Sequence, residues 1–390
     1  MAGGYNEPVI ISGAGPAGMA AAITLARAGR RVSIHERHRA VGSRFHGDLQ
    51  GLENWTTATD VTDELAGLGL GPGFSAVPFH EAVLYDPQGG EHRYRSPQPM
   101  AYIVRRGDED GALDRWLKEQ ALAAGVEFRF GEVCRTLPEG GIEAGGPHGA
   151  HAIGIGYLFD TEMADGAYIA LSDRLAPKGY AYLLIQGGRG TLMSWMYDDF
   201  HNELRYLDRC EAFFQSRVGL DMKNRRRTGG AAGYYFPRTA CKGNILYVGE
   251  SAGFQDALWG FGMRYALLSG HLAARALLSG RPGDYDRLWR ERLGRQLQAG
   301  LVNRWFYQRL GDRGYNTLLS SIDRALRERP DGRNWLHGYT APGFWKSLCF
   351  PLIWRQYRAR LKSADRAPDR SPADCVCTWC RCRRKARRVY

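Results

Sequence analysis

The sequence predicts an α/β protein, and three observations lead to this fold class. A β-branched run, Pro8–Ser12, precedes a glycine turn and a helix of small and apolar residues, Pro16–Gly29. A second apolar run, Arg31–His35, completes a strand–helix–strand opening. Further along, short apolar runs between turn residues predict an inserted antiparallel sheet, and the pattern then becomes helical and aromatic-rich from Asp284 to Leu361.

A glycine-rich turn joins the first strand to the first helix. Gly13, Gly15 and Gly18 follow the G-x-G-x-x-G pattern. The first glycine makes the tight turn, the second lets the backbone approach a pyrophosphate, and the third lets the helix pack closely on the strand. Glu36 ends the second strand, where its carboxylate can accept the ribose hydroxyls. The sequence therefore predicts a Rossmann-type dinucleotide site at a helix N-terminus, with further contacts from Ala14, Pro16, Ala17 and Arg37.

A second glycine motif distinguishes FAD from NAD. The run Ile245–Gly253 is a strand that ends in a glycine and an acid, and Gly260–Met263 then opens a helix. In flavin proteins this acid holds a ribityl hydroxyl, and the positive end of the next helix stabilises the anionic reduced flavin. We therefore expect one non-covalently bound FAD, with contacts from Gly249, Glu250, Gly260, Phe261, Gly262 and Met263.

The predicted architecture is a Rossmann-type FAD-binding domain with an inserted antiparallel β-sheet substrate domain and a helical C-terminal region. Strands are expected at 167–171, 181–185 and 191–196, helices at 113–124, 203–215 and 264–278, and turns through Gly131–Gly156. The parts alternate along the chain: FAD-binding domain at 5–75, 101–165 and 241–280; substrate sheet at 76–100 and 166–240; helical region at 281–362; and a basic, Cys-rich tail at 363–390.

The order of these motifs resembles the geranylgeranyl reductase family of flavoproteins, which shares a fold with p-hydroxybenzoate hydroxylase. Tyr102–Arg106, followed by Leu113–Leu117 and Ala123–Val126, is similar to the family's segment of Arg, then Asp-x-x-Leu, then Ala-Gly. In the family that arginine lies near the cofactor, so the resemblance implies a cofactor contact from one of two adjacent arginines. We favour Arg105 for this contact.

The sequence departs from the family at three places. Gly249-Glu250 stands where the family usually has Gly-Asp, and the longer carboxylate should keep the ribityl contact. The family's Cys-Gly near the flavin becomes His46-Gly47, which leaves any thiol role empty. The Tyr-x-Trp-x-Phe-Pro motif of the substrate sheet becomes Tyr180–Ile185, in which a tyrosine remains and the Trp, Phe and Pro are gone. The substrate can therefore differ from that of the family.

The resemblance implies hydride transfer at flavin N5 to or from a C–C bond. Such chemistry needs an apolar cavity and a nearby proton donor. His46 is the candidate catalytic residue, with Asp48 to orient it; the alternative is that this segment only flanks the cofactor. Four aromatic residues are candidates for substrate binding, and core packing is the alternative for them: Tyr180, Tyr182, Tyr235 and Trp259.

We therefore expect an enzyme, an FAD-dependent reductase acting on an apolar, isoprenoid or lipid-like substrate. Nothing between Ala181 and Ile185 could bind a carboxylate or a phosphate. The middle of the chain lacks a second G-x-G-x-x-G, so NADPH or a reduced electron-carrier protein would act as a transient donor. The alternatives are an FAD-dependent monooxygenase, or a dehydrogenase or oxidase, acting on a small natural product. The Trp-Ile motif usual in flavin-dependent halogenases is missing.

The net charge of +12 is concentrated at the C-terminal end. Twelve Lys/Arg and three Asp lie between Arg355 and Tyr390, a net of +9, which leaves about +3 for the remaining chain. A basic tail on a near-neutral body does not indicate nucleic-acid binding, and a solvated tail is the simplest interpretation.

Four closely spaced cysteines in the tail could bind a soft metal: Cys375, Cys377, Cys380 and Cys382. Structural zinc sites, however, pair two separated Cys-x-x-Cys segments. We therefore expect no metal site here and interpret the four cysteines as reactive thiols.

An apolar, aromatic segment, Gly343–Trp354, precedes this basic stretch. It is too short to span a bilayer, but it suits an interfacial helix or loop with Trp at headgroup level. Packing onto the flavin domain is the alternative. Since no signal peptide or long apolar run is visible, and four other cysteines are scattered as free thiols, we expect a cytoplasmic protein with peripheral membrane contact as an option.

Overall fold

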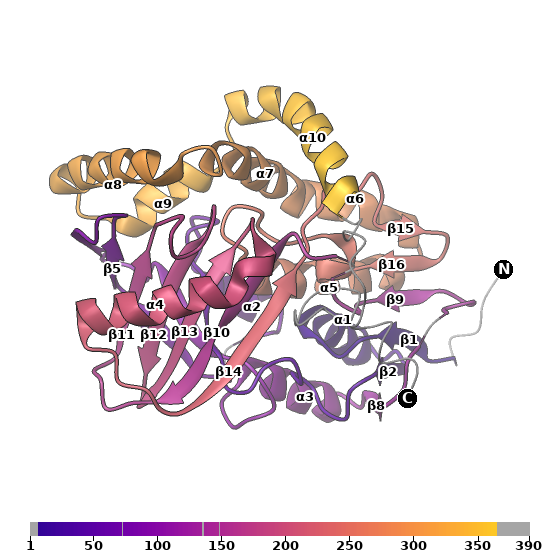
Figure 1. The fold of residues 1–390 in the computed structure, drawn as a ribbon. Helices are drawn as coiled ribbons and strands as arrows, with labels where there is room; N and C mark the ends of the chain where they lie inside the picture. Colours follow the sequence, from indigo (N-terminus) through magenta and orange to yellow (C-terminus); the bar gives the residue numbers. More distant parts are fainter. Residues whose placement is uncertain (1–6, 72, 135, 148, 365–390) are drawn as a thin grey trace. The chain divides into compact units, whose positions relative to one another are not determined.

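Figure 1 shows the computed structural model, which describes residues 7–71, 73–134, 136–147 and 149–364. The predicted tail and its four cysteines lie almost entirely outside these residues. The described residues form two compact units. The first lies within 1–78, 101–148 and 234–300, and the second within 79–100, 149–233 and 301–390.

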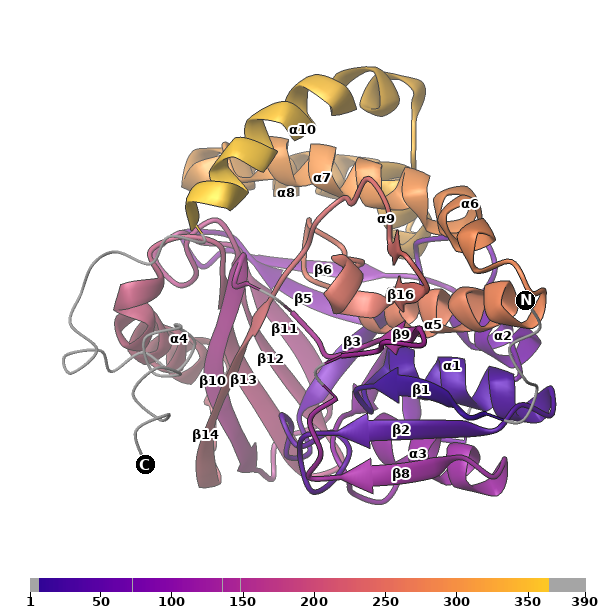
Figure 2. The same ribbon diagram turned by 90° about the vertical axis from the view of Figure 1, so that its right-hand side faces the viewer.

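The first unit contains the predicted Rossmann-type sheet. Its order is β15-β16-β9-β1-β2-β8, and β1, β2 and β8 lie side by side in Figure 2. All described pairs are parallel except the β15–β16 hairpin. The strands are β1 (Val9–Ser12), β2 (Val32–Glu36), β8 (Glu127–Phe130), β9 (Gly141–Glu143), β15 (Cys241–Lys242) and β16 (Ile245–Tyr247).

Two helices of the first unit approach each other very closely. A Cβ added at Gly270 of α5 would lie 2.0 Å from the carbonyl oxygen of Ala17 in α1, so only glycine allows this contact. Apolar faces of these helices fill one continuous core with the sheet. The helical segments are α1 (Pro16–Arg27), α2 (Val61–Gly67), α3 (Leu113–Ala123), η2 (Gly249–Ala252), α5 (Met263–Leu278), η3 (Pro282–Asp284), α6 (Tyr285–Trp289) and η4 (Arg290–Gly294).

A smaller, three-stranded sheet begins with the strand that follows β2 along the chain. Its order is β3-β7-β4, with β3 (Leu49–Glu53), β7 (Ala101–Arg105) and β4 (Ala76–Phe79). The β3–β7 pair is antiparallel, and Leu49 faces Arg105 across it. The end of β3 lies beside the core of the first unit, where Leu52 is fully buried.

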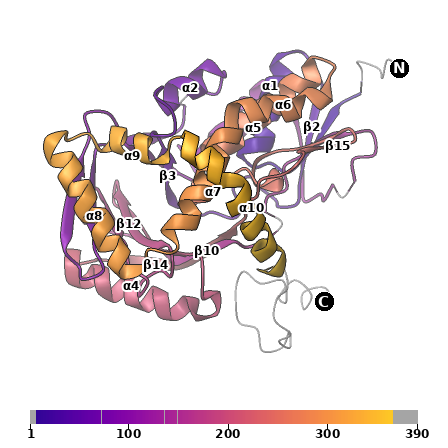
Figure 3. The same cartoon turned by 90° about the horizontal axis from the view of Figure 1, so that it is seen from above.

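The second unit is built on the inserted sheet, in the order β14-β10-β13-β12-β11-β5-β6. Its described pairs are antiparallel except β11–β5, which is parallel. Figure 3 shows α4 running along this sheet, and α4 packs on β10 and β13. The elements are β5 (Glu81–Tyr85), β6 (Glu91–Arg95), β10 (Ala152–Asp160), β11 (Gly166–Ala170), β12 (Tyr180–Gln186), β13 (Arg189–Met196), η1 (Phe200–Asn202), α4 (Glu203–Val218) and β14 (Lys223–Ala232).

Strand β12 shows why this sheet has two different faces. Ala181, Leu183 and Ile185 are fully buried in the core under α4. Successive strand residues point to opposite faces, so Tyr180 and Tyr182 lie on the other side of the sheet. The two tyrosine rings neighbour each other there, with centroids 5.9 Å apart.

The expected turn-rich stretch, Gly131–Gly156, instead contains β9 and the start of β10. Strand β10 pairs with β13 and β14, so residues that we assigned to the second part of the FAD-binding domain belong to the inserted sheet. The glycines within β10 allow close packing rather than a turn, although Gly131 and Gly140 do stand in turns with positive φ. A Cβ added at Gly154 would lie 2.8 Å from Trp195, whose ring covers it.

Helices make up the described C-terminal region, as predicted. They are α7 (Arg295–Tyr307), α8 (Gly311–Glu328), α9 (Gly332–Thr340) and α10 (Phe344–Ala364). Arg304 of α7 is fully buried and stacks on Tyr197, with 4.0 Å from its guanidinium carbon to the ring centroid. Among the described helices, none is long and apolar enough to cross a bilayer. The predicted fold class is confirmed.

Candidate functional site

The turn between β1 and α1 has the geometry that the glycine pattern predicts. Gly13 has φ +105°, and a Cβ there would lie 2.5 Å from the Ala144 carbonyl oxygen. A Cβ at Gly18 would lie 2.1 Å from the Gly13 carbonyl oxygen, so Gly18 brings the helix onto the turn. By contrast, a Cβ at Gly15 would meet no described heavy atom within 4 Å. Protein packing therefore requires Gly13 and Gly18, whereas Gly15 borders open space.

Glu36 reaches from the end of β2 to this turn. One carboxylate oxygen accepts the Ala14 N–H at 2.9 Å, and the other accepts the His38 N–H at 2.9 Å. A carboxylate has about four acceptor positions, so two contacts leave capacity for ribose hydroxyls. Arg37 is exposed, and its Nε donates to the His38 ring at 3.2 Å.

The second glycine motif lies against the first. Gly249 has φ +57°, and a Cβ there would lie 3.0 Å from the Ala17 side chain. Its N–H donates to the Ser269 hydroxyl of α5 at 2.9 Å. The neighbouring Glu250 forms an ion pair with Arg44 at 3.4 Å. The acid of the second motif therefore lies in the same unit as the pyrophosphate turn, next to the start of α1.

A tight turn leads from this motif to the N-terminus of α5. Asp256 accepts the Trp259 N–H at 2.7 Å and donates its own N–H to the Phe261 carbonyl at 2.8 Å. Gln255 Nε2 donates to the Gly260 carbonyl at 2.7 Å. Gly262 is the N-cap residue, and no described side chain caps the helix that begins at Met263. The first-turn amides of α5 therefore stay available to a ligand.

An aromatic cluster borders this turn. The Trp55 ring meets Phe261 edge-on, with centroids 4.9 Å apart, and meets Trp259 at 5.9 Å. Phe261 also covers Gly51 of β3, where a Cβ would lie 2.8 Å from its ring. Sequence reasoning selected Trp259 and Phe261 but missed Trp55, because nothing in the sequence shows that the end of β3 returns to this turn.

The two adjacent arginines have different environments. Arg106 is buried and forms a bidentate ion pair with Asp114, at 2.8 and 2.9 Å. Arg105, our predicted cofactor contact, is half-buried, and its Nη1 donates to the Asp110 carbonyl at 3.3 Å. Its Nε is buried without a hydrogen-bond partner among the described residues. Arg106 is thus already used in its ion pair with Asp114, whereas the Nε of Arg105 could still donate a hydrogen bond to a ligand.

The candidate catalytic residue, His46, is exposed on the segment before β3. Its main-chain N–H donates to the Asp48 carboxylate at 2.8 Å, and Asp48 is buried. Asp48 therefore orders this segment through the backbone. Gly47 N–H donates to the Arg106 carbonyl at 3.0 Å, which ties the same segment to β7.

The predicted substrate residues fall in different units. Tyr235 and Trp259 belong to the first unit, and Tyr235 N–H donates to the Gly253 carbonyl at 3.0 Å. Tyr180 and Tyr182 belong to the second unit, on the sheet face opposite α4. The structure thus places the predicted FAD residues and Trp259 in the first unit and the β12 tyrosines in the second.

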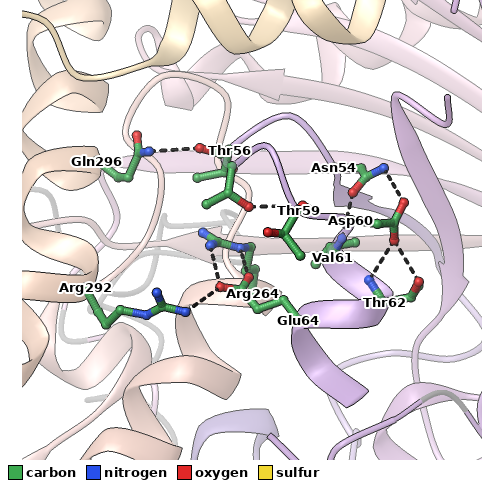
Figure 4. A network of polar contacts seen from close by, with 11 residues as sticks. Asn54, Thr56, Thr59, Asp60, Val61, Thr62, Glu64, Arg264, Arg292 and Gln296 are labelled. Carbon is green, nitrogen blue, oxygen red and sulfur yellow. Dashed lines mark hydrogen bonds and ion pairs between the residues drawn. The ribbon is translucent and has the colours of Figure 1, made fainter. Parts of the chain in front are cut away.

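A polar network, drawn in Figure 4, fixes the segment after β3. Asn54 accepts the Val61 N–H at 2.7 Å and donates to Asp60 at 2.8 Å. Glu64 of α2 receives Arg264 Nε at 2.6 Å and Arg292 Nη2 at 3.1 Å. These contacts fasten the start of α2 to the first turn of α5.

Glu53, which sequence reasoning did not select, lies next to this network. It is 2% exposed, and neither carboxylate oxygen has a hydrogen-bond partner among the described residues. Burial raises the pKa of Glu53 from 4.5 to about 8, although Arg264 opposes this shift. The sequence signal was only a charged residue directly after Leu52 at the end of a short strand.

These features fit FAD. Gly15 leaves space at a helix N-terminus, Glu36 has spare acceptors for a ribose, and Glu250 stands beside the same helix. A second helix, α5, offers unoccupied amides at Gly262–Met263. A dinucleotide with a pyrophosphate, a ribose, a ribityl chain and a polar ring system matches this donor set.

Comparisons with known proteins agree with this geometry. Residues 11–49 match a family described as an NAD(P)-binding Rossmann-like domain. The digeranylgeranylglycerophospholipid reductase of Haloferax volcanii is 25% identical over 399 residues, covering 84% of this chain and 92% of that protein. Over most of its length the chain is therefore similar to reductases of the geranylgeranyl type. The expected resemblance is confirmed, and with it the expectation of a redox enzyme.

Solved structures share the fold. A geranylgeranyl bacteriochlorophyll reductase-like protein from Thermoplasma acidophilum has a TM-score of 0.68 at 18% identity, covering 90% of this chain and 98% of that one. A flavin-dependent brominase has a TM-score of 0.58 at 17% identity, covering 91% and 98%. The fold therefore supports more than one flavin chemistry.

The open space at Gly15 generates the first prediction. Gly15→Val should abolish FAD binding and leave the thermal unfolding temperature of the FAD-free protein nearly unchanged, because its φ of −81° suits any residue. Flavin absorbance per chain and circular-dichroism melting measure the two effects. Gly338→Val, also at an open position, is the matched control and should keep FAD. Full flavin content in Gly15→Val would show that the pyrophosphate binds elsewhere.

Glu53 generates a prediction about pH. The folded chain keeps the Glu53 proton up to about pH 8, whereas the unfolded chain loses it near pH 4.5. The unfolded state binds fewer protons in this window, so Glu53 should lower the free energy of unfolding as pH rises, by at most about 1.4 kcal/mol per pH unit. Urea unfolding of wild type and Glu53→Gln between pH 5 and 8 measures this contribution as the difference in slope. Equal slopes would contradict it.

Proposed function

We propose that the protein is an FAD-dependent reductase of the geranylgeranyl reductase type. It would transfer a hydride to or from a C–C bond of an apolar, isoprenoid or lipid-like substrate. The observation that carries this proposal is the junction of two glycine turns at α1 and α5 within one unit, each leaving helix N-terminal amides available. The relatives named as reductases of geranylgeranyl lipids support the substrate class.

The residues divide the work of holding FAD. The start of α1, with Gly13–Gly18, would bind the pyrophosphate, and Glu36 would bind the adenosine ribose. Glu250 would hold a ribityl hydroxyl, and Arg105 would use its free donor on the cofactor. The α5 N-terminus at Gly262–Met263 would face the ring system. When bound, FAD supplies hydride transfer at N5, and NADPH or a reduced electron-carrier protein would restore it.

The inserted sheet offers an apolar surface for the substrate. Tyr180 and Tyr182 pair with Trp195 and Met193 across β12 and β13, all on the face opposite α4. These four side chains carry no formal charge. A long hydrocarbon chain would bury apolar area on such a surface, whereas a small acid would find no cation among these four.

His46 remains the sequence-derived candidate for proton transfer. Its side chain is exposed, and its backbone is fixed by Asp48. Because the FAD contacts come from other segments, replacing His46 should affect turnover alone. An FAD-dependent monooxygenase, or a dehydrogenase or oxidase acting on a small natural product, is the second candidate, favoured by the shared fold with a probable FAD-dependent monooxygenase from Pseudomonas aeruginosa.

The reaction type is tested by photoreducing the flavin anaerobically and adding polyprenyl lipids with isolated double bonds. Wild type should be reoxidised by the lipid and yield a saturated product. His46→Ala should keep its FAD and react on the order of 10²-fold more slowly, the contribution of one acid–base group. His201→Ala removes another exposed imidazole and should react normally. Reoxidation by oxygen alone, coupled to hydroxylation of an aromatic compound, would favour the monooxygenase instead.

We further propose that α10 contacts an anionic membrane surface. Phe344, Leu348 and Leu352 follow one another at four-residue spacing and are 86%, 70% and 65% exposed. Trp345 packs edge-on against Phe306 of α7, with centroids 5.8 Å apart, and both rings stay partly exposed. The sequence from Arg355 onward carries a net charge of +9. An exposed apolar helix face followed by excess positive charge complements anionic lipid headgroups.

Vesicle sedimentation tests this contact with phosphatidylglycerol-containing and pure phosphatidylcholine vesicles at low salt. Truncation after Ser363 should keep FAD and weaken binding to the anionic vesicles, since each Lys/Arg near the surface contributes about 1 kcal/mol. Leu348→Glu should weaken binding to both vesicle types. Leu122→Glu, at an exposed leucine of α3, is the control and should bind normally. Unchanged binding in both altered proteins would contradict the proposal, and monomerisation by Leu348→Glu would identify α10 as a self-association surface.

A further inference from the structure

Glu53 ends β3 on the strand face that packs toward the start of α5. Residues two apart in a strand share a face, so Glu53 and Gly51 point the same way. Phe261, from the turn before α5, covers Gly51 on that face. Glu53 therefore faces the region of the Gly260–Met263 turn, which the proposed function assigns to the flavin ring.

The charged residues around Glu53 would not neutralise a negative charge on its carboxylate. Arg264, on α5, is its strongest electrostatic neighbour, but Arg264 already forms a two-bond ion pair with Glu64 of α2, at 2.6 and 3.0 Å. Glu64 and Asp256 of the preceding turn are both acidic and repel a negative charge at Glu53. The arrangement favours a neutral carboxylic acid, which can donate a hydrogen bond and a proton.

Stability alone does not account for this residue. A buried carboxyl group with no hydrogen-bond partner destabilises the folded state, and an apolar side chain of similar size would not. Arg264 Nη1 and Gln255 Oε1 are likewise buried without partners among the described residues. Several unsatisfied polar atoms on neighbouring elements point to a ligand, a substrate or ordered water that completes them.

We propose that Glu53 is a proton donor for the reaction at the turn before α5. The inference rests on the proposed function and adds a second proton-carrying group to His46. The His46 imidazole lies exposed on the segment before β3, whereas the Glu53 carboxyl group is 2% exposed beside the turn.

Alkene reduction requires a proton as well as a hydride. The C=C π bond would be replaced by two C–H bonds. Bound, reduced FAD would supply one carbon with a hydride, which carries two electrons, and Glu53 would supply the other carbon with a proton. The Glu53 O–H bond breaks and leaves a carboxylate, which takes a proton from water before the next cycle. The proposed NADPH or electron-carrier protein restores the two electrons.

The decisive variant is Glu53→Gln, which keeps the shape of the side chain and removes the acid. Infrared difference spectra of the FAD-loaded proteins, wild type minus variant at pH 7, should show the C=O band of a protonated carboxyl group. This measurement needs no substrate. Carboxylate bands in its place would overturn the proposal, because an ionised Glu53 cannot donate.

The second measurement is anaerobic flavin reoxidation by a polyprenyl lipid across a pH series. Wild type should lose rate above about pH 8, as the acid ionises. Glu53→Gln should be on the order of 10²-fold slower and should show no further loss of rate at alkaline pH. Glu53→Asp should restore part of the rate and part of its dependence on pH. Glu119→Gln, which removes an exposed carboxylate of α3, controls for the lost charge.

The outcomes separate the two proposals. If the lipid does not reoxidise the wild-type flavin, the proposed function fails, and the infrared band still reports whether Glu53 is protonated. If the lipid is reduced and Glu53→Gln matches wild type in rate and pH profile, the proton-donor role fails and the function stands. A slower variant that retains the wild-type pH profile would make Glu53 a packing residue and also overturn the inference.

Discussion

The first unit depends on how closely α1 and α5 approach each other around Ala17. Gly270 of α5 contacts the Ala17 carbonyl at a distance that excludes any Cβ, and Gly249 lies against the Ala17 side chain. Gly18 brings the start of α1 equally close to Gly13. A larger residue at these positions would separate the helices and move the second glycine motif away from the first. Close backbone packing is therefore what joins two motifs that are more than two hundred residues apart.

Buried ion pairs hold the surrounding loops in register with these helices. Arg106 and Asp114 connect β7 to α3, and Arg264 and Glu64 connect α5 to α2. Each pair is nearly excluded from water, so loss of one partner would leave an uncompensated charge and cost about 3–5 kcal/mol. The side chains in these two pairs already bind each other and have little capacity left for a ligand. Arg105 and Glu53 have buried polar atoms without a partner among the described residues, so they are better candidates for binding the cofactor or donating a proton.

The second unit uses another principle, the alternation of strand side chains. One face of β12 is closed by α4 over Ala181, Leu183 and Ile185, and this leaves Tyr180 and Tyr182 on the opposite face. The same alternation places Gly154 beneath Trp195, where a side chain would collide with the ring. The sheet thus combines a conventional core under α4 with an uncharged group on the other face, formed by Tyr180, Tyr182, Met193 and Trp195.

The sequence by itself determined the parts whose signals are local. Gly13–Gly18 and Glu36 predict their own turn because a strand, a glycine pattern and a helix follow one another directly, and the helical region after Asp284 follows from its periodicity. Tertiary structure decided what depends on distant partners. Glycines obscured the strand pattern of β10, and only the fold shows that Trp195 covers Gly154. The ion pair with Asp114 is what distinguishes Arg106 from Arg105. Burial beside α5 raises the pKa of Glu53, and this burial depends on residues far apart in the chain that no local pattern connects.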